Sequence, residues 1–142
     1  MSTSRVEGLL KRTFLDWKLS LEACRRRDGR YSISHLGGRL DLYVMPIRGI
    51  VMESSLLRLP REGTKRAARL RQALAFSVKQ MTQRHDVLTT SHDGLVLVLQ
   101  HEMDECETSR AIEAEIVRFM AAVDRWRQVM GREEELNDGR YR

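Results

Sequence analysis

Cysteine is scarce in this sequence, and charged residues interrupt every apolar segment. Cys24 and Cys106 lie far apart and form neither a C-x-x-C pair nor a Cys/His cluster, so neither a disulfide framework nor a zinc site is indicated. No segment approaches the ~20 apolar residues of a membrane span, and the first residues show no apolar run of the signal-peptide kind. A length of 142 residues fits one domain. We therefore expect a single soluble domain, with a core over about 4–131 and a polar tail over 132–142 that frays, and a cytoplasmic location.

The common catalytic motifs are also missing. The sequence contains no Walker A pattern, G-x-G-x-x-G, G-x-S-x-G or H-E-x-x-H. The histidines are not spaced from a nucleophile in a recognisable way, and we interpret His35, His85, His92 and His101 as turn or surface residues. The acidic run Glu102–Glu107 lacks the glycine and alternating oxygen ligands of a calcium loop. No enzymatic activity, catalytic residue, metal or cofactor is predicted.

The first forty residues predict a helix followed by extended chain. Ser4 and Glu7 form a capping-box pattern, which marks a helix start. An apolar stripe at helical spacing then runs to Cys24, and Asp28-Gly29 should end the helix. The stripe consists of Val6, Leu10, Phe14, Trp17, Leu21 and Cys24.

Strands and helices alternate in the rest of the chain. Runs over 30–36, 39–47 and 50–59 are separated by Gly37-Gly38 and Arg48-Gly49, whose glycines permit hairpin turns. A helix over 64–84 should bury Ala67, Leu70, Leu74, Val78 and Met81. Strands over 86–91 and 95–101 flank Asp93-Gly94, a strong hairpin signal. Thr108 or Ser109 should cap a last helix ending at Gly131, with Ile112, Ile116, Phe119, Val123, Trp126 and Met130 buried.

The net charge of +5, with a pI near 9.7, leaves an anionic partner open. The densest clusters, Arg25–Arg27 and the arginines after Lys65, are typical of solvated helix faces and ends. Readers of single-stranded nucleic acid present aromatic residues on a sheet, and here only Tyr31 and Tyr43 qualify. A small basic nucleic-acid-binding or regulatory protein is therefore the alternative interpretation, and nucleic acid is the less favoured partner.

Three apolar residues fall outside the predicted core stripes. Leu15 and Leu19 should lie side by side on a charged face of the first helix, and Phe76 lies well away from the stripe of the second. Phenylalanine is enriched at interfaces, and the neighbouring Ala73 would let another backbone approach. Leu15 and Leu19 form either a contact patch or two incidental surface leucines, and Phe76 lies either in a subunit interface or under a loop.

The order helix, three strands, helix, two strands, helix resembles that of class I type III secretion chaperones, over residues 4–131. The most similar part is His85–Gly94, followed by Leu95–Leu99 and a helix with Phe119 and Trp126. The resemblance implies an α+β fold with a twisted antiparallel sheet packed with helices. It also implies a homodimer in the bacterial cytoplasm that binds the unfolded N-terminal segment of a secreted effector and keeps it competent for export.

The resemblance also implies where the partners bind. In that family the second helix and the fourth strand form the dimer interface, which corresponds here to Ala73, Phe76 and the segment Val87–Thr90, including Thr89. The client wraps around the first helix and the first three strands. That surface corresponds to Leu15, Leu19, Tyr31, Ile33, Leu42, Val44 and Met52. Many members are acidic, whereas this chain is basic, which suggests an acidic client segment.

Overall fold

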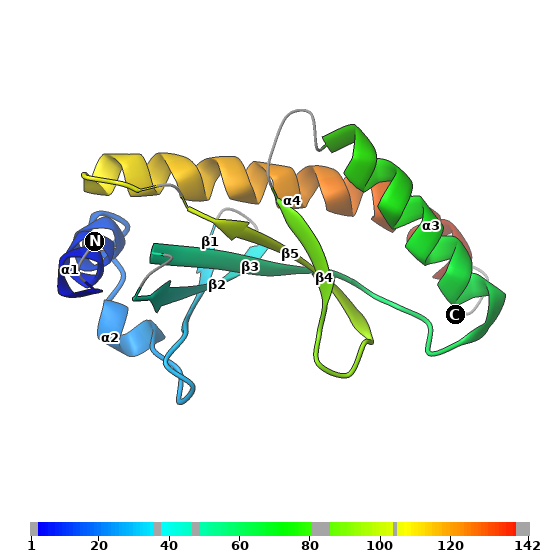
Figure 1. The fold of residues 1–142 in the computed structure, drawn as a ribbon, viewed down its shortest axis with the longest axis horizontal. Coiled ribbons are helices and arrows are strands. Elements are labelled where there is room, and N and C mark those ends of the chain that lie inside the picture. Colours follow the sequence, from blue (N-terminus) through cyan, green and yellow to red (C-terminus); the bar gives the residue numbers. More distant parts are fainter. Residues whose placement is uncertain (1–2, 36–37, 47–48, 81–85, 104, 139–142) are drawn as a thin grey trace. The chain divides into compact units, whose positions relative to one another are not determined.

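The computed structural model describes residues 3–35, 38–46, 49–80, 86–103 and 105–138. Its elements confirm the predicted α+β class, with one short additional helix, α2 (Figure 1). They are α1 (Thr3–Asp16), α2 (Leu21–Cys24), β1 (Tyr31–His35), β2 (Gly38–Met45), β3 (Gly49–Arg58), α3 (Gly63–Gln80), β4 (Val87–Thr90), β5 (Val96–Glu102) and α4 (Ser109–Asp138).

The five strands form one antiparallel sheet in the order β1-β2-β3-β5-β4, so β1 and β4 are its edges. The register places Leu42 opposite both Tyr31 and Met52. Gly49 and Gly94 have φ angles of +85° and +73°, the left-handed conformation for which glycine was predicted in these hairpin turns. The predicted strand ends Leu36 and Ile47, and the turn residues Gly37 and Arg48, lie outside the described residues.

Backbone contacts divide the chain into two compact units, Met1–Ser54 with Gln100–Ala121 and Ser55–Leu99 with Ala122–Arg142. In the first unit, α1 packs on β2 and α2 on β1. Val6, Leu10 and Phe14 of α1 are buried, as their spacing predicts. The rest of this core comes from the inward-facing residues of the strands and from the first turns of α4. It includes Leu21, Tyr31, Ile33, Leu40, Leu42, Ile50, Met52, Ile112, Ile116 and Phe119.

The prediction of a continuous first helix as far as Cys24 is wrong. The chain leaves α1 through a Schellman motif, in which Lys18 N–H donates to Leu15 O at 2.9 Å and Leu19 N–H donates to Phe14 O at 2.8 Å. Lys18 has a φ of +60°, a conformation that usually requires glycine. Ser20 then caps α2 by accepting from Ala23 N–H. The break was not predicted because the residue with positive φ is a lysine, whereas a glycine is what marks the end of a helix in a sequence.

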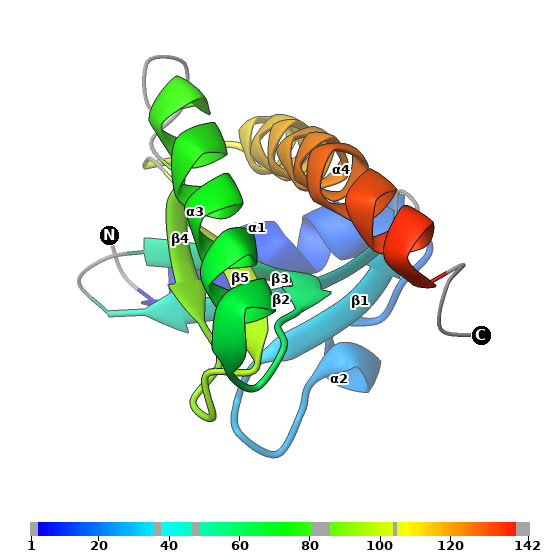
Figure 2. The ribbon, with the colours of Figure 1, turned by 90° about the vertical axis from the view of Figure 1, so that its right-hand side faces the viewer.

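The second unit contains α3, β4, the end of β3, the start of β5 and the last part of α4. α3 lies beside the last part of α4 (Figure 2). There Phe76 packs edge-on against Trp126, with ring centroids 4.7 Å apart. Two arginines of α3 donate to backbone carbonyls of this unit: Arg66 to Pro60 and Gly94 at 3.0 and 3.1 Å, and Arg69 to Met130 at 2.8 Å. The packed face of α3 is therefore partly polar.

The predicted burial of Leu74 and Val78 is wrong, since these side chains are 61% and 66% exposed. Ala73, on a different face of the helix, is fully buried. The helix carries apolar residues on two faces. Its packed face also includes Arg66 and Arg69, which bind backbone carbonyls, so the spacing of apolar residues does not identify that face. Met81 and Arg84, at the predicted end of this helix, lie outside the described residues.

The predicted stripe of α4 is confirmed over its whole length, because all six of its residues from Ile112 to Met130 are buried. Thr108 caps the helix, accepting from Ala111 N–H at 3.1 Å. The predicted end at Gly131 is corrected, since α4 continues to Asp138, and residues 139–142 of the predicted tail lie outside the described residues. Of the helices in the described ranges, none combines the length and apolar character needed to cross a membrane.

Candidate functional site

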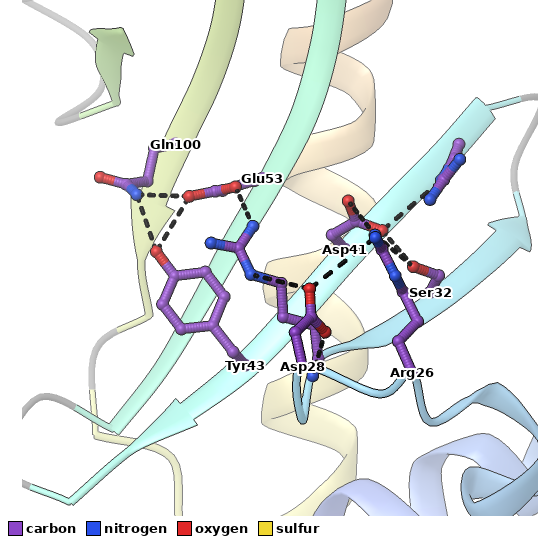
Figure 3. A network of polar contacts seen from close by, with 9 residues as sticks. Arg26, Asp28, Ser32, Asp41, Tyr43, Glu53 and Gln100 are labelled. Carbon is purple, nitrogen blue, oxygen red and sulfur yellow. Dashed lines mark hydrogen bonds and ion pairs between the residues drawn. The ribbon is translucent and has the colours of Figure 1, made fainter. Parts of the chain in front are cut away.

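The polar face of the sheet in the first unit holds a network of interacting charged and polar groups (Figure 3). Side chains alternate between the two faces of a strand, so Ser32, Asp41, Tyr43 and Glu53 lie opposite the buried face. The register brings Asp41 beside both Ser32 and Glu53. Residues from four strands and from the segment before β1 therefore meet on one surface.

Glu53 is the centre of one half of this cluster. One of its oxygens, Oε2, accepts from Arg30 Nη1 at 2.8 Å, and the other, Oε1, accepts from Tyr43 OH at 2.9 Å and Gln100 Nε2 at 2.7 Å. The guanidinium of Arg30 also lies over the Tyr43 ring, 4.7 Å from its centroid. Both oxygens of this half-buried carboxylate are thus occupied by donors from neighbouring elements.

The environment of Tyr43 keeps its phenol protonated. Burial, followed by the hydrogen bond to Glu53 and the charge of that carboxylate, raises the pKa of Tyr43 to about 12, although Arg30 opposes the shift. At neutral pH Tyr43 therefore acts as a hydrogen-bond donor. The geometry is that of a network that fixes the positions of side chains, and it presents no activated nucleophile.

Asp41 is the centre of the other half. Ser32 Oγ donates to Asp41, while Arg26 and Arg39 each lie 3.6 Å from its carboxylate oxygens. Arg26 also lies 3.7 Å from Asp28, which holds the turn before β1 by accepting from Arg30 N–H at 3.0 Å. The two halves are joined through Asp28 and Arg30.

Acidic and basic groups lie at different depths in this network. The side chains of Asp41 and Glu53 are 21% and 17% exposed, whereas those of Arg26 and Arg39 are 43% and 63% exposed. These two carboxylates are covered, whereas the side chain of Asp28 is 49% exposed, as accessible as the arginines that it contacts. The surface therefore presents charges of both signs.

The outer edge of β1 adds backbone groups to this surface. The carbonyl of Arg30 points outward, where it accepts from Arg26 N–H at 2.7 Å beside the Arg25–Tyr31 bridge. In an antiparallel strand the outward-facing residues alternate, so Ser32 and Ser34 follow Arg30 on this side. Their N–H and C=O groups face away from β2. The Arg25–Tyr31 bridge places the chain's own Cys24 opposite Ser32, so another strand could be added only beyond it, at Ser34.

Four of the seven predicted client-contact residues belong to the core, which corrects their assignment. Tyr31, Ile33, Leu42 and Met52 are at most 5% exposed, because they lie on the face of the sheet that is covered. The sequence alone could not determine which alternating face is covered. The remaining three are more accessible: Leu15 is 59% exposed, and Leu19 and Val44 are half-buried. Leu19 does not extend a helical patch with Leu15, since it lies beyond α1.

The residues predicted for the dimer interface fall into two groups. Ala73 is fully buried by the chain itself, whereas Phe76 contacts Trp126 and is half-buried. The exposed large apolar residues of α3 are Leu74 and Val78. On β4, Val87 is 55% exposed and Thr89 is exposed, at an edge of the sheet.

The histidines and cysteines do not form a second site within the described ranges. His101 is not a surface residue as predicted: it packs 6.2 Å from the Phe119 ring, with Nε2 3.3 Å from Glu115 Oε2. His92 is exposed in its turn, and His85 lies outside the described residues. Cys106 is buried, and burial raises the pKa of the half-buried Cys24 thiol. Over the described parts of the chain, no three His, Cys, Asp or Glu side chains are grouped to hold a metal ion.

Sequence analysis did not identify the polar network. The sequence does contain polar residues that mark this face. Asp41 and Tyr43 alternate with Leu40 and Leu42 in β2, and Glu53 and Gln100 interrupt otherwise apolar strands. Correct hairpin registers would have placed these residues together. A scan against protein-family models matches no family, and a search of curated proteins finds no match to this chain.

Proposed function

We propose that this protein is a chaperone of the type III secretion kind, which binds an extended N-terminal segment of a secreted effector and keeps it soluble and competent for export. The observation that supports this most is the edge of β1, where the backbone groups of Ser34 point outward beyond the Arg25–Tyr31 bridge. An extended polypeptide can add to such an edge by main-chain hydrogen bonds, without any catalytic group. The order of helices and strands is the one on which the resemblance rests.

Apolar contacts would supplement this strand pairing. Leu15 is exposed near the end of α1, and Leu19 and Val44 keep part of their surface accessible. Burying a leucine side chain contributes roughly 1.5–3 kcal/mol, so a few such contacts would add substantially to strand pairing. The client surface therefore excludes the four core residues and consists of the β1 edge with these accessible apolar groups.

The proposed active form is a homodimer. Its contact surface combines Leu74 and Val78 of α3 with Val87 and Thr89 of β4, which are exposed in the same unit. Exposed large apolar side chains that gather on one unit mark interaction surfaces. Pairing through a helix face and an edge strand would cover both.

The client can be identified by purifying the tagged full chain from its native cells and analysing bound proteins by mass spectrometry. Calorimetric titration with the identified N-terminal segment would then compare Ser34→Pro with Ser34→Ala. Proline removes the outward N–H of Ser34, whereas alanine keeps it, so only the proline variant should lose binding. Leu15→Asp should also bind less tightly. Equal affinity of the proline and alanine variants would contradict client binding at this edge.

A second candidate function is the binding of an anionic polymer such as nucleic acid. Residues 55–99 contain eight Lys or Arg against three Asp or Glu, and Arg58, Arg61, Lys65 and Arg71 are exposed. Phosphate contacts would make such binding weaken steeply with salt. Titration of a single-stranded oligonucleotide at low and physiological salt, with Arg61→Gln and Arg71→Gln combined, tests it. Unchanged affinity in that variant would reject this surface.

A further inference from the structure

The unit that contains the proposed dimer surface also carries all of the chain's net charge. Ser55–Leu99 and Ala122–Arg142 together contain 13 Lys or Arg against 8 Asp or Glu, which equals the +5 of the whole chain. The other unit is balanced, with 12 residues of each sign. The excess positive charge and the exposed apolar residues of α3 and β4 therefore belong to the same unit.

The helix at this surface carries positive charge only. α3 contains five Lys or Arg and no Asp or Glu from Gly63 to Gln80. Arg71 is exposed one turn before Leu74, so the two side chains are neighbours on the helix surface. Arg66 donates to two backbone carbonyls, which satisfy its N–H groups but carry no net charge. These contacts therefore leave the charge of Arg66 in place.

Resting on the proposed homodimer, we infer that its two copies associate against like-charge repulsion, so that the dimer dissociation constant falls as the ionic strength rises. A two-fold interface brings the same surface of both copies together. Arg71 of one copy then meets the α3 surface of the other copy, which offers no carboxylate to pair with it. The apolar contacts drive the association, and dissolved ions determine how much of it the repulsion cancels.

The size of the effect follows from the charges of the two units. Two touching units of this size have their centres about 25 Å apart, and each unit carries +5. The Debye length is about 30 Å at 0.01 M salt and about 8 Å at 0.15 M, so the repulsion acts across the whole contact in the first buffer and is largely screened in the second. Coulomb's law in water then gives a dissociation constant about 5- to 20-fold lower at 0.15 M salt than at 0.01 M.

Sedimentation equilibrium of the full chain at about 0.01 and 0.15 M NaCl measures this change. Arg61→Gln combined with Arg71→Gln removes two exposed positive charges from the basic unit. The product of the two unit charges then falls to about one third, so the effect of salt should shrink to about 2- to 3-fold. This variant should also dimerise more tightly than the wild type at the lower salt concentration. Arg61→Lys combined with Arg71→Lys keeps the charge and should keep the full effect.

A matched control removes the same charge from the balanced unit. Arg12→Gln combined with Arg110→Gln changes two exposed positions of that unit and should keep most of the effect of salt. Salts also strengthen apolar contacts in general, but that contribution is common to the wild type and to every variant. The difference between the two glutamine variants therefore reports the repulsion alone.

The outcomes distinguish failure of this inference from failure of the proposed dimer. A chain that stays at 16.5 kDa in every buffer contradicts the dimer, and the inference with it. A dimer whose dissociation constant is equal or higher at the higher salt concentration leaves the dimer standing and overturns the inference. An undiminished effect in the Arg61→Gln and Arg71→Gln variant, or an equal reduction in the control, overturns the assignment to the basic unit. Circular dichroism checks that each variant is folded.

Discussion

The exposed apolar face of α3 gives the most quantitative test of the proposed dimer. Leu74 and Val78 lie one turn apart, and 61% and 66% of their surfaces remain exposed. Replacing both with Asp should leave the chain folded, because neither belongs to the packed face with Ala73 and Phe76. It should strongly weaken self-association.

The magnitude follows from the exposed fractions. Full burial of a leucine or valine contributes roughly 1.5–3 kcal/mol, so burying the remaining three-fifths contributes about 1–2 kcal/mol for each side chain. In a two-fold symmetric dimer each residue contributes twice. Four side chains then supply about 4–8 kcal/mol, equivalent to a factor of roughly 10³–10⁶ in the dimer dissociation constant.

Sedimentation equilibrium over a concentration series would measure the dissociation constant of the wild type and of the double variant. Val117→Asp is a matched control, since Val117 is an exposed valine of α4 outside this surface. It should leave the dimer intact. A wild-type protein that stays at 16.5 kDa at micromolar concentration, or a double variant that dimerises as tightly as the wild type, would refute the reasoning.

Three further predictions concern the fold. Lys18→Gly should stabilise the chain by about 1 kcal/mol, because Lys18 has a φ of +60° that only glycine adopts without strain. Thermal unfolding would then show a higher midpoint temperature. A lower midpoint temperature would contradict the Schellman motif. Gly131→Ala should raise the free energy of unfolding by about 0.5–1 kcal/mol, since Gly131 lies inside α4 with open space around it. A lower free energy of unfolding in urea denaturation would indicate that the helix ends at this residue. The pKa of Tyr43 is about 12 in the folded chain against an ordinary value of 10.0, so the folded state holds this proton more tightly and loses stability as pH rises from 10 towards 12. Tyr43→Phe should flatten the dependence of the urea midpoint over that range, and an unchanged slope would show that Tyr43 does not cause it.

The elements themselves could be predicted because local chemistry specifies them. Gly49 and Gly94 lie in the hairpin turns, whose positive φ favours glycine. The apolar residues from Ile112 to Met130 lie on one face of α4 and are buried, so the sequence pattern and the packing agree in this helix. α3 is different, since its apolar residues occupy two faces and its packed face includes Arg66 and Arg69. Two of their backbone acceptors, Gly94 and Met130, are distant in the sequence, so this face is identified only once the chain has folded.

The candidate site was less predictable for a similar reason. An alternating strand shows that two faces differ but not which is covered, so Tyr31, Ile33 and Leu42 were assigned to a contact surface although they form the core. The network around Glu53 depends on registers that join β2, β3 and β5. Those registers are long-range properties of the fold.

Hydrogen–deuterium exchange of backbone amides would test the central claim, that a client strand adds to the edge of β1. The full chain is compared alone and in complex with the client segment recovered from native cells. We predict that client binding slows exchange in the peptide covering Ser34, because its outward N–H group gains an acceptor, and that Ser34→Pro abolishes the complex. Tight client binding without protection of this segment would contradict the account.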